Sequence, residues 1–446
     1  MIKNNSQILI PSIDILHGQT VQLQNGDPNK EKVNAGNPID MVAELKIAGE
    51  IAVIDLDSAL GIGSNLDIIK QIANICDCRV GGGIRTYEKA IDLLDCGVNK
   101  IIIGTCATPE FLKKLPKNRL IAALDMNSKK VLSHGWTKET KHTVEEKMIE
   151  LKDYVSGFLV TFVENEGCMT GLDMKRVREL YNIIKDDDIQ LTIAGGISTI
   201  QELIELDSMG IQGQVGMAIY TGQMNLADAI TAPLITDRKD GLYTTVVVDE
   251  LNKVLGVCYS SKESIRKSVE HLRGVYYSRS RKELWYKGNT SGNIQELLKV
   301  SMDCDRDTLC FTVKQIGTGF CHLGYRNCFN IESGMDKLYR LLNGRLTDNS
   351  SKSYTKKLFN SNSLLQSKII EEAIEFVEAE DKDHIVKEAC DLLYFTFVKC
   401  VKNNISLYDI EQELDKRMLK IRKRGGNMKK NVDKILSNYS IKSITK

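Results

Sequence analysis

The sequence of 446 residues lacks an excess of charge of either sign, with 60 basic and 59 acidic side chains and a formal net charge of +1. Such a chain has no general field to attract nucleic acid or an acidic membrane, so neither is expected as a partner. It also lacks any run of about 18 uninterrupted apolar residues, so we expect no membrane-spanning helix. The twelve cysteines are scattered from Cys76 to Cys400, unlike the short disulfide framework of small secreted domains. These absences predict a soluble, cytoplasmic protein.

Proline and glycine are missing from long parts of the chain, and their distribution divides it. All six prolines lie between Pro11 and Pro233, and residues 345–424 contain neither proline nor glycine, which is helical composition. Between these parts, the runs "LYTTVVVD", "VLGVCYS" and "LWYKG" have the β-branched and aromatic residues of strands. We therefore expect domains at residues 1–230, 231–330 and 331–430, followed by a basic tail at 431–446 to which no role is assigned.

The first region repeats itself. The segment "IPSID" ends at Asp14, "AALD" ends at Asp125 111 residues later, and "VGGGIRT" recurs as "IAGGIST" at an offset of 113. Short apolar runs alternate with helical segments throughout, as in a parallel sheet covered by helices. Two halves, each of four strand–helix units, predict a (β/α)8 barrel.

Asp14 and Asp125 end equivalent strands, so both are expected at the mouth of the barrel, where active sites of this fold lie. Paired carboxyl groups can divide acid and base roles if their surroundings separate their pKa values. The simpler interpretation is that each caps the next helix, but the recurring glycine segments favour a functional pair. Backbone amides at helix N-termini bind phosphate, so two symmetric cradles predict a substrate with a phosphate at each end. The expected cradles are Gly82, Gly83, Gly104 and Thr105 on one side, and Gly195, Gly196 and Gly216 on the other.

These stretches, with "VIDLDSALG", "AALDMNSKKVLSHGW" and "VGMAIYTG", resemble the phosphoribosylformimino-aminoimidazole carboxamide ribotide isomerase of histidine biosynthesis over residues 8–228. The resemblance implies an Amadori rearrangement without a cofactor, in which Asp14 is the general base and Asp125 the general acid. It also implies that Thr161 assists the reaction and that Trp136 lies near the substrate base.

The sequence departs from that family at Gln22, where many members have arginine, and at Glu166 and Cys168, where aspartate and threonine are common. These changes affect the substrate-binding loop and leave the acid–base pair intact. A barrel retained as a ligand-binding or dimer scaffold is the alternative to an active isomerase. The sister cyclase is less favoured because "KKVLSHGW" follows the isomerase pattern.

The middle region concentrates potential metal ligands in "DCDRDTLCFTVKQIGTGFCHLGYRNC", residues 303–328. Three thiols and a water are the pattern of catalytic zinc. Aspartates at alternate positions of a strand share one face, and they would repel one another unless a hard cation such as Mg²⁺ lay among them. A zinc ribbon would require Cys-x-x-Cys pairs, which are missing. The expected ligands are Cys304, Cys321 and Cys328 for zinc and Asp303, Asp305 and Asp307 for magnesium.

The preceding segment, residues 275–293, is rich in cations and hydroxyls of the kind that bind a phosphoribosyl group, although a polar turn would look similar. With "DGLYTTVVVD", "KGNTSGN" and "DCDRD", it closely resembles phosphoribosyl-AMP cyclohydrolase over residues 236–329. The resemblance implies opening of the adenine ring by zinc-activated water, with His322 as proton-transfer partner. It also implies a homodimer, since the zinc ligands of the family come from two subunits. One departure is Asn289, where glutamate is common. The expected phosphoribosyl contacts are Arg279, Arg281, Lys287, Thr290 and Ser291.

The third region has two amphipathic helical segments, 364–380 and 385–400, whose acidic residues recur at helical spacing among apolar neighbours. A solvated charged stripe is the ordinary interpretation, whereas carboxylates facing one another favour Mg²⁺ bound to substrate phosphates. The pattern resembles phosphoribosyl-ATP pyrophosphohydrolase over residues 335–424. By that resemblance Mg²⁺ is held by Glu371, Glu372, Glu375, Glu388 and Asp391, and phosphate contacts come from Lys356, Lys357 and Lys368.

Together the three resemblances imply a multifunctional enzyme of histidine biosynthesis that acts on small phosphoribosyl nucleotides. It would form a homodimer through its second and third domains and use Zn²⁺ and Mg²⁺. The competing hypothesis is a bifunctional hydrolase whose barrel is not catalytic.

Overall fold

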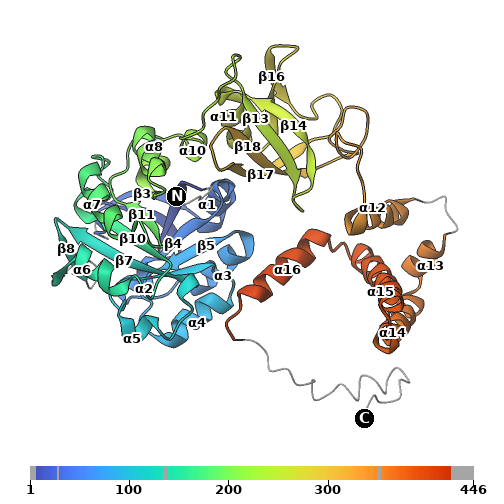
Figure 1. Ribbon diagram of the computed structural model, residues 1–446, viewed down its shortest axis with the longest axis horizontal. Helices are drawn as coiled ribbons and strands as arrows, with labels where there is room; N and C mark the ends of the chain where they lie inside the picture. The colour runs from blue at the N-terminus through green and yellow to red at the C-terminus, as the bar shows by residue number, and fades with distance from the viewer. Residues whose placement is uncertain (1–6, 28–29, 134–135, 137, 349–352, 423–446) are drawn as a thin grey trace, which may run out of the picture.

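Eight parallel strands close into a barrel in the first region of the computed structural model, which describes residues 7–27, 30–133, 136, 138–348 and 353–422 (Figure 1). The barrel closes because β1 pairs with β12 and β7 pairs with β10. This confirms the predicted (β/α)8 fold, whereas the proposed tail at 431–446 lies outside the described residues. The barrel strands are β1 (Leu9–Leu16), β4 (Ile51–Asp55), β5 (Cys78–Gly81), β6 (Lys100–Ile103), β7 (Leu120–Asn127), β10 (Gly157–Phe162), β11 (Gln190–Ala194) and β12 (Gln212–Val215).

Helices cover the outside of the barrel, and side-chain caps mark where several of them begin. Thr143 and Thr199 each form a capping box with a glutamate three residues later, which satisfies backbone amides that a helix leaves free. The longer helices are α1 (Pro38–Leu45), α3 (Leu66–Ile75), α4 (Tyr87–Asp95), α6 (Val144–Leu151), α7 (Met174–Ile184) and α8 (Ile200–Ser208).

Two hairpins extend the barrel at the mouth. One is formed by β2 (Gln19–Leu23) and β3 (Glu31–Gly36) after β1, and the other by β8 (Lys130–Ser133) and β9 (Lys138–Thr143) after β7. Because β1 and β7 are the equivalent strands that carry Asp14 and Asp125, the hairpins stand beside both carboxyl groups.

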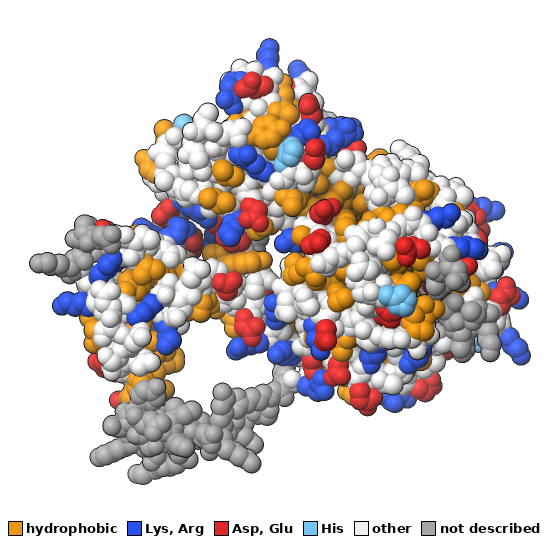
Figure 2. Space-filling view, turned by 180° about the vertical axis from the view of Figure 1, so that it is seen from behind, with side chains coloured by type: hydrophobic (Ala, Val, Ile, Leu, Met, Phe, Trp, Pro, Cys, Tyr) orange, Lys and Arg blue, Asp and Glu red, His pale blue; other side chains and the backbone are white. Residues whose placement is uncertain are grey.

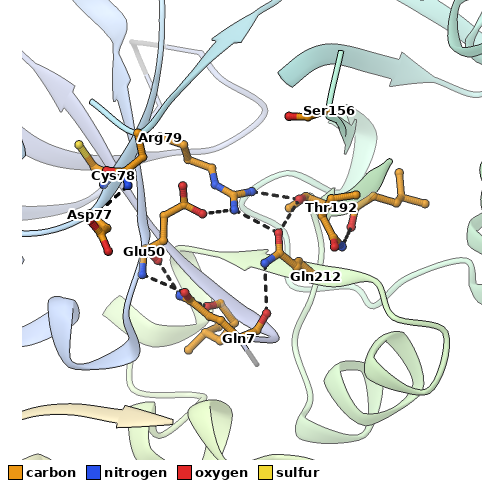
Figure 3. Close-up of polar contacts among 12 residues, drawn as sticks. Gln7, Glu50, Asp77, Cys78, Arg79, Ser156, Thr192 and Gln212 are labelled. Carbon is orange, nitrogen blue, oxygen red and sulfur yellow. Dashed lines mark hydrogen bonds and ion pairs between the residues drawn. The ribbon is translucent and has the colours of Figure 1, made fainter. Parts of the chain in front are cut away.

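A buried polar layer occupies the other end of the barrel (Figure 3). The Arg79 guanidinium, 3% exposed, forms an ion pair with Glu50 and donates hydrogen bonds of 3.1 Å to Thr192 Oγ1 and to Gln212 Oε1. Gln7 Nε2 in turn donates to the Glu50 carbonyl oxygen at 2.7 Å. A buried charge needs such partners, and here they come from β5, β11, β12 and the segments before β1 and β4.

The middle region is a four-stranded sheet in the order β14–β13–β18–β17, with a separate hairpin of β15 and β16. The aspartates at 303, 305 and 307 lie in the turn between β17 and β18, so the prediction that they alternate along a strand is wrong. Asp303 Oδ1 accepts backbone hydrogen bonds from Asp307 and Thr308, both 3.1 Å, which closes a turn instead. The elements are β13 (Tyr243–Asp249), β14 (Val254–Ser260), α11 (Lys262–His271), β15 (Val275–Ser278), β16 (Glu283–Tyr286), β17 (Gln295–Met302) and β18 (Thr308–Gln315).

The third region is helical, as predicted, and has its own small core around Leu342, Leu358 and Val398. Its helices α14 and α15 pack against each other, whereas α16 runs back to the barrel (Figure 1). There Arg119 Nη1 donates to the Leu419 carbonyl at 2.8 Å, and Ile421 N donates to Asp95 Oδ1 at 2.8 Å. The helices are α12 (Gly334–Thr347), α13 (Tyr354–Asn360), α14 (Asn362–Glu378), α15 (Lys382–Lys402) and α16 (Leu407–Leu419).

Hydrophobic side chains reach the surface over the helical region (Figure 2). Phe376, Val377 and Val386 of α14 and α15 are between 38% and 63% exposed. Leu323, Phe329 and Ile331, after the last strand of the sheet, are between 55% and 71% exposed. Several large apolar side chains are thus exposed in both the middle and the helical regions. Among the described helices, none has both the length and the apolar character needed to cross a membrane.

Candidate active sites

One cavity at the mouth of the barrel is lined by both predicted carboxyl groups, Asp14 and Asp125, and by Thr161 and Trp136. Burial raises the pKa of Asp14 to about 6, although the Ser12 hydroxyl, which donates to it at 3.0 Å, acts in the opposite direction. Burial also raises the pKa of Asp125, against hydrogen bonds from the Trp136 and Thr161 side chains. Each group is therefore more readily protonated than a surface aspartate, as acid–base chemistry near neutral pH requires.

Glu166 adds a third carboxyl group to the same cavity. Burial, together with the charges of Asp14 and Asp125, raises the pKa of Glu166 to about 8. The loop that carries it is fastened to the turn after β2, because Asn25 N donates to the Glu166 carbonyl oxygen at 3.0 Å and Cys168 Sγ contacts Asn25 Oδ1 at 3.3 Å. The sequence marked Glu166 only as a departure from a pattern and did not indicate this position.

The two glycine cradles have the same backbone form. Gly82 and Gly195 have φ values of +101° and +85°, and a Cβ atom on either would overlap the carbonyl oxygen of the residue that ends a neighbouring strand, Asp55 or Phe162. The cavity is lined by Gly82, Gly83, Gly104, Thr105 and Gly216. Gly196 packs instead against Asn165 and Gly171 of the loop that carries Glu166.

Three further residues of the cavity were not predicted as contacts. The Gln22 side chain is 3% exposed, and neither its Nε2 nor Gln214 Oε1 has a hydrogen-bond partner among the described residues. Arg85 lies beside the first cradle, where it donates to the carbonyl oxygens of Ser58 and Ala59 at 3.3 and 2.7 Å. Unpaired polar atoms and a cation in a concave site suit a phosphorylated, hydroxyl-rich substrate.

Two of the three predicted zinc ligands lie together in the middle region. Burial and the neighbouring Cys321 thiol raise the pKa of Cys328, so these two sulfur atoms are close. Cys304 is exposed and belongs to neither of the groups of potential ligands found among the described residues. His322 is exposed next to Cys321. The three predicted thiols therefore form no single group among the described residues, whereas the Cys258 thiol, which was not predicted as a ligand, lies near Cys328.

The predicted phosphoribosyl contacts of the middle region differ in their exposure. Lys287 is 4% exposed, and its ammonium group lies 5.3 Å from the centre of the Phe320 ring. Burial lowers the pKa of Lys287, whereas the nearby thiols of Cys258, Cys328 and Cys321 act to raise it. The Arg279 guanidinium lies over the Tyr259 ring at 3.8 Å, and Arg281 pairs with Glu283 at 3.2 Å. Thr290 and Ser291 are exposed in the turn that follows.

The helical region brings Glu372 of α14 together with Glu388 and Asp391 of α15, with carboxylate oxygens within 4.8 Å of one another. Glu388 Oε2 is buried and has no hydrogen-bond partner among the described residues. The pKa of Glu375 is raised, first by desolvation and then by the negative charges of Glu372 and Glu388. Three carboxylates in this arrangement fit a hard divalent cation. Their meeting was predicted from the sequence and is confirmed.

The predicted lysines of the helical region lie in different surroundings. Lys368 bridges Glu371 and Glu372 at 2.8 and 2.7 Å, and these contacts raise its pKa. Lys356 donates to the carbonyl oxygens of Asp348 and Leu346 at the C-terminal end of α12, at 2.5 and 3.2 Å, while Lys357 is exposed. Of these three lysines, Lys368 is therefore the one that borders the acidic cluster.

Three families match consecutive segments of the chain. The family described as histidine biosynthesis protein matches residues 8–225, phosphoribosyl-AMP cyclohydrolase matches residues 256–330, and phosphoribosyl-ATP pyrophosphohydrolase matches residues 335–418. These segments follow the barrel, the β-rich region and the helical region in order.

An imidazole-4-carboxamide isomerase of Methanocaldococcus jannaschii is 35% identical over 234 residues, which are 98% of that protein and 50% of this chain. The chain belongs to the histidine biosynthesis protein family. Two other relatives come from fungi, and each is called a histidine biosynthesis trifunctional protein. That of Saccharomyces bayanus is 51% identical over 205 residues, 46% of this chain and 26% of that protein. That of Komagataella pastoris is 34% identical over 347 residues, 77% of this chain. The chain spans between about a quarter and two fifths of the length of these fungal relatives.

Proposed function

We propose that the chain catalyses three reactions of histidine biosynthesis on one polypeptide, with domains at residues 1–230, 231–330 and 331–430. The helical domain hydrolyses phosphoribosyl-ATP to phosphoribosyl-AMP and pyrophosphate, and the middle domain opens the adenine ring of phosphoribosyl-AMP. The barrel then isomerises the resulting aminoaldose to an aminoketose. The cytoplasm is the proposed compartment, since the twelve cysteines are unpaired.

The observation that carries the barrel reaction is the pair Asp14 and Asp125, held at equivalent strand ends in one cavity. Asp125 donates its proton to the ring oxygen as the C1–O bond of the ribose breaks. Asp14 removes the proton from C2, and the enolamine then tautomerises to the ketose, so no atom is gained or lost. Thr161 and Trp136 orient Asp125 through their hydrogen bonds to it. Phosphate groups bind at Gly82, Gly83, Gly104 and Thr105, and at Gly195, Gly196 and Gly216.

The acidic cluster of the helical domain supports the pyrophosphohydrolase. The unpaired, buried Glu388 Oε2 and the nearby carboxylates fit Mg²⁺, which when bound would neutralise the substrate phosphates. Glu371, Glu372, Glu375, Glu388 and Asp391 are the proposed ligands. Lys368 would contact phosphate from the edge of this cluster, and Lys356 and Lys357 are proposed as further contacts.

The middle domain is proposed to act as a homodimer, because two thiols of one chain meet without the third. Cys321 and Cys328 of one subunit with Cys304 of the other complete a three-sulfur set that fits zinc, which supplies an activated water when bound. His322 would transfer the proton. Exposed apolar residues of the middle and helical domains support a dimer through both.

Magnesium in the middle domain would be held by Asp303, Asp305 and Asp307, whose carboxylate oxygens lie within 4.8 Å of one another. Substrate contacts are proposed for Arg279, Arg281, Lys287, Thr290 and Ser291.

The alternative is a bifunctional hydrolase whose barrel serves as a scaffold. Incubating the chain with phosphoribosyl-ATP, Mg²⁺ and Zn²⁺ and separating the products by chromatography distinguishes the two, because the barrel's substrate and product are isomers that mass alone cannot resolve. We expect the ketose to accumulate. The variant Asp14→Asn should lose isomerisation by roughly three orders of magnitude or more and keep both hydrolyses. Accumulation of the aminoaldose by the unsubstituted chain would favour the scaffold.

A further inference from the structure

The turn that carries Asp303, Asp305 and Asp307 places three carboxylates within 4.8 Å of one another. Like charges at this separation repel one another, so the turn needs contacts that hold it closed. Within the turn, Asp303 N donates to the Thr308 carbonyl at 3.0 Å, and Thr308 Oγ1 donates to Asp307 Oδ1 at 2.8 Å. Asp303 Oδ1 also accepts from the backbone amides of Asp307 and Thr308, so these bonds join the two ends of the turn.

The middle of the turn is held by the barrel through Arg306. Its backbone has φ +65°, a conformation that L-residues rarely adopt. Its guanidinium donates to the Asp303 carbonyl oxygen at 3.4 Å and also forms a bidentate ion pair with Asp207 of α8, with Nη2–Oδ1 at 2.6 Å and Nε–Oδ2 at 3.2 Å. Beside it, Ile235 N donates to the Arg306 carbonyl oxygen at 2.8 Å.

Asp207 lies in the last turn of α8, where the partial negative charge of the helix end disfavours a carboxylate. Its side chain is 13% exposed and that of Arg306 is 14% exposed, so the pair is largely shielded from water. A shielded bidentate pair restricts both partners far more than a surface pair does.

We propose that Asp207 of the barrel is a positioning residue for the metal site of the middle domain. Through Arg306 it holds the strained centre of the turn, so that Asp303, Asp305 and Asp307 stay close enough to bind one divalent cation. The barrel thereby completes a site that belongs to a different reaction. This inference rests on the proposed role of the turn as a cation site.

The test is Mn²⁺ binding to the full-length chain, measured by electron paramagnetic resonance. A Glu388→Gln and Asp391→Asn background removes the other acidic cluster. In this background, Asp207→Asn should weaken Mn²⁺ binding roughly tenfold, as is typical when the residue that orients a metal ligand is lost. Asp228→Asn is the matched control. It breaks another bidentate pair between barrel and middle domain, with Arg266 at 2.7 and 2.8 Å, that does not involve the turn. Its Mn²⁺ affinity should stay within about twofold.

A double-mutant cycle tests whether Asp207 acts through Arg306. Arg306→Gln should weaken Mn²⁺ binding as much as Asp207→Asn does, and the double variant should be no weaker than either. Additive losses, equal losses in the Asp228→Asn control, or no Mn²⁺ binding by the background protein would each overturn the proposal. Ring opening by the unsubstituted chain is measured separately, so failure of the proposed cyclohydrolase would be recognised independently of Mn²⁺ binding.

Discussion

Three carboxyl groups share the barrel cavity, and their mutual repulsion in a buried site prevents all three from being charged near neutral pH. With pKa values of about 6 for Asp14 and about 8 for Glu166, the first is mainly a carboxylate at pH 7 and the second mainly an acid. The cavity can therefore offer a base and an acid at once. Glu166 becomes a candidate proton donor beside Asp125.

The pH dependence of isomerisation separates these two donors. Activity should rise as pH passes about 6, where Asp14 becomes charged, and fall above about 8 if Glu166 must stay protonated. Glu166→Gln should then remove the alkaline limb of the kcat/KM profile and lower the maximum by roughly 10²-fold. An unchanged alkaline limb in this variant would leave Asp125 as the donor.

Arg79 provides a stability prediction for the closed end of the barrel. Arg79→Ala removes the buried cation and leaves the half-buried Glu50 without this partner, which should lower the free energy of unfolding by roughly 3–5 kcal/mol. Arg178→Ala is the control. The side chains of Arg178 and Glu205 are 61% and 31% exposed, so their ion pair should contribute less than about 1 kcal/mol. Urea denaturation of the two variants compares them, and equal losses would contradict the assignment of the polar layer as a structural element.

At the scale of elements, the hairpin of α14 and α15 concentrates the proposed metal ligands of the helical domain. Glu388→Gln keeps the shape of the side chain but removes a charge from the cluster, so pyrophosphate release should fall roughly 10²-fold and require more Mg²⁺. Glu378→Gln, at the exposed end of α14, is the control and should change neither quantity. Measuring pyrophosphate across a Mg²⁺ titration decides the outcome, and full activity in Glu388→Gln would exclude this residue as a ligand.

Some elements could be predicted because their pattern is local or repeated. The offset between Asp14 and Asp125 indicated the barrel, and helical spacing placed Glu372 opposite Glu388. The turn at Asp303–Asp307 was taken for strand, since its alternating aspartates imitate strand periodicity while backbone hydrogen bonds to Asp303 close it. Arrangements set by packing of distant segments, such as the place of Glu166 in one cavity with Asp14 and Asp125, have no signature in the local sequence.

At the scale of the whole molecule, the separated thiols predict complementation between inactive subunits. Cys304→Ala and Cys321→Ala should each lose ring opening. In a dimer of one Cys304→Ala subunit and one Cys321→Ala subunit, one of the two shared zinc sites has both substitutions and the other has neither. Random exchange of equal amounts should therefore recover roughly a quarter of wild-type ring opening. A mixture of Cys321→Ala with Cys328→Ala, which lie on the same side of the proposed site, should recover none. Activity in either single variant, or none in the first mixture, would contradict a shared site.

The contact between α16 and the barrel also has a consequence for the order of events during synthesis. The barrel cannot close before Val215 is made, because β12 pairs with β1. The residues that contact the barrel from the end of α16, between Lys416 and Arg422, are synthesised about 200 residues later. At a translation rate of ~5–20 residues per second, this is a delay of ~10–40 s. During that interval Asp92, Asp95 and Arg119 already stand on a folded surface. The barrel, which leaves the ribosome before the helical region, thus provides a folded surface against which the end of the last described helix packs.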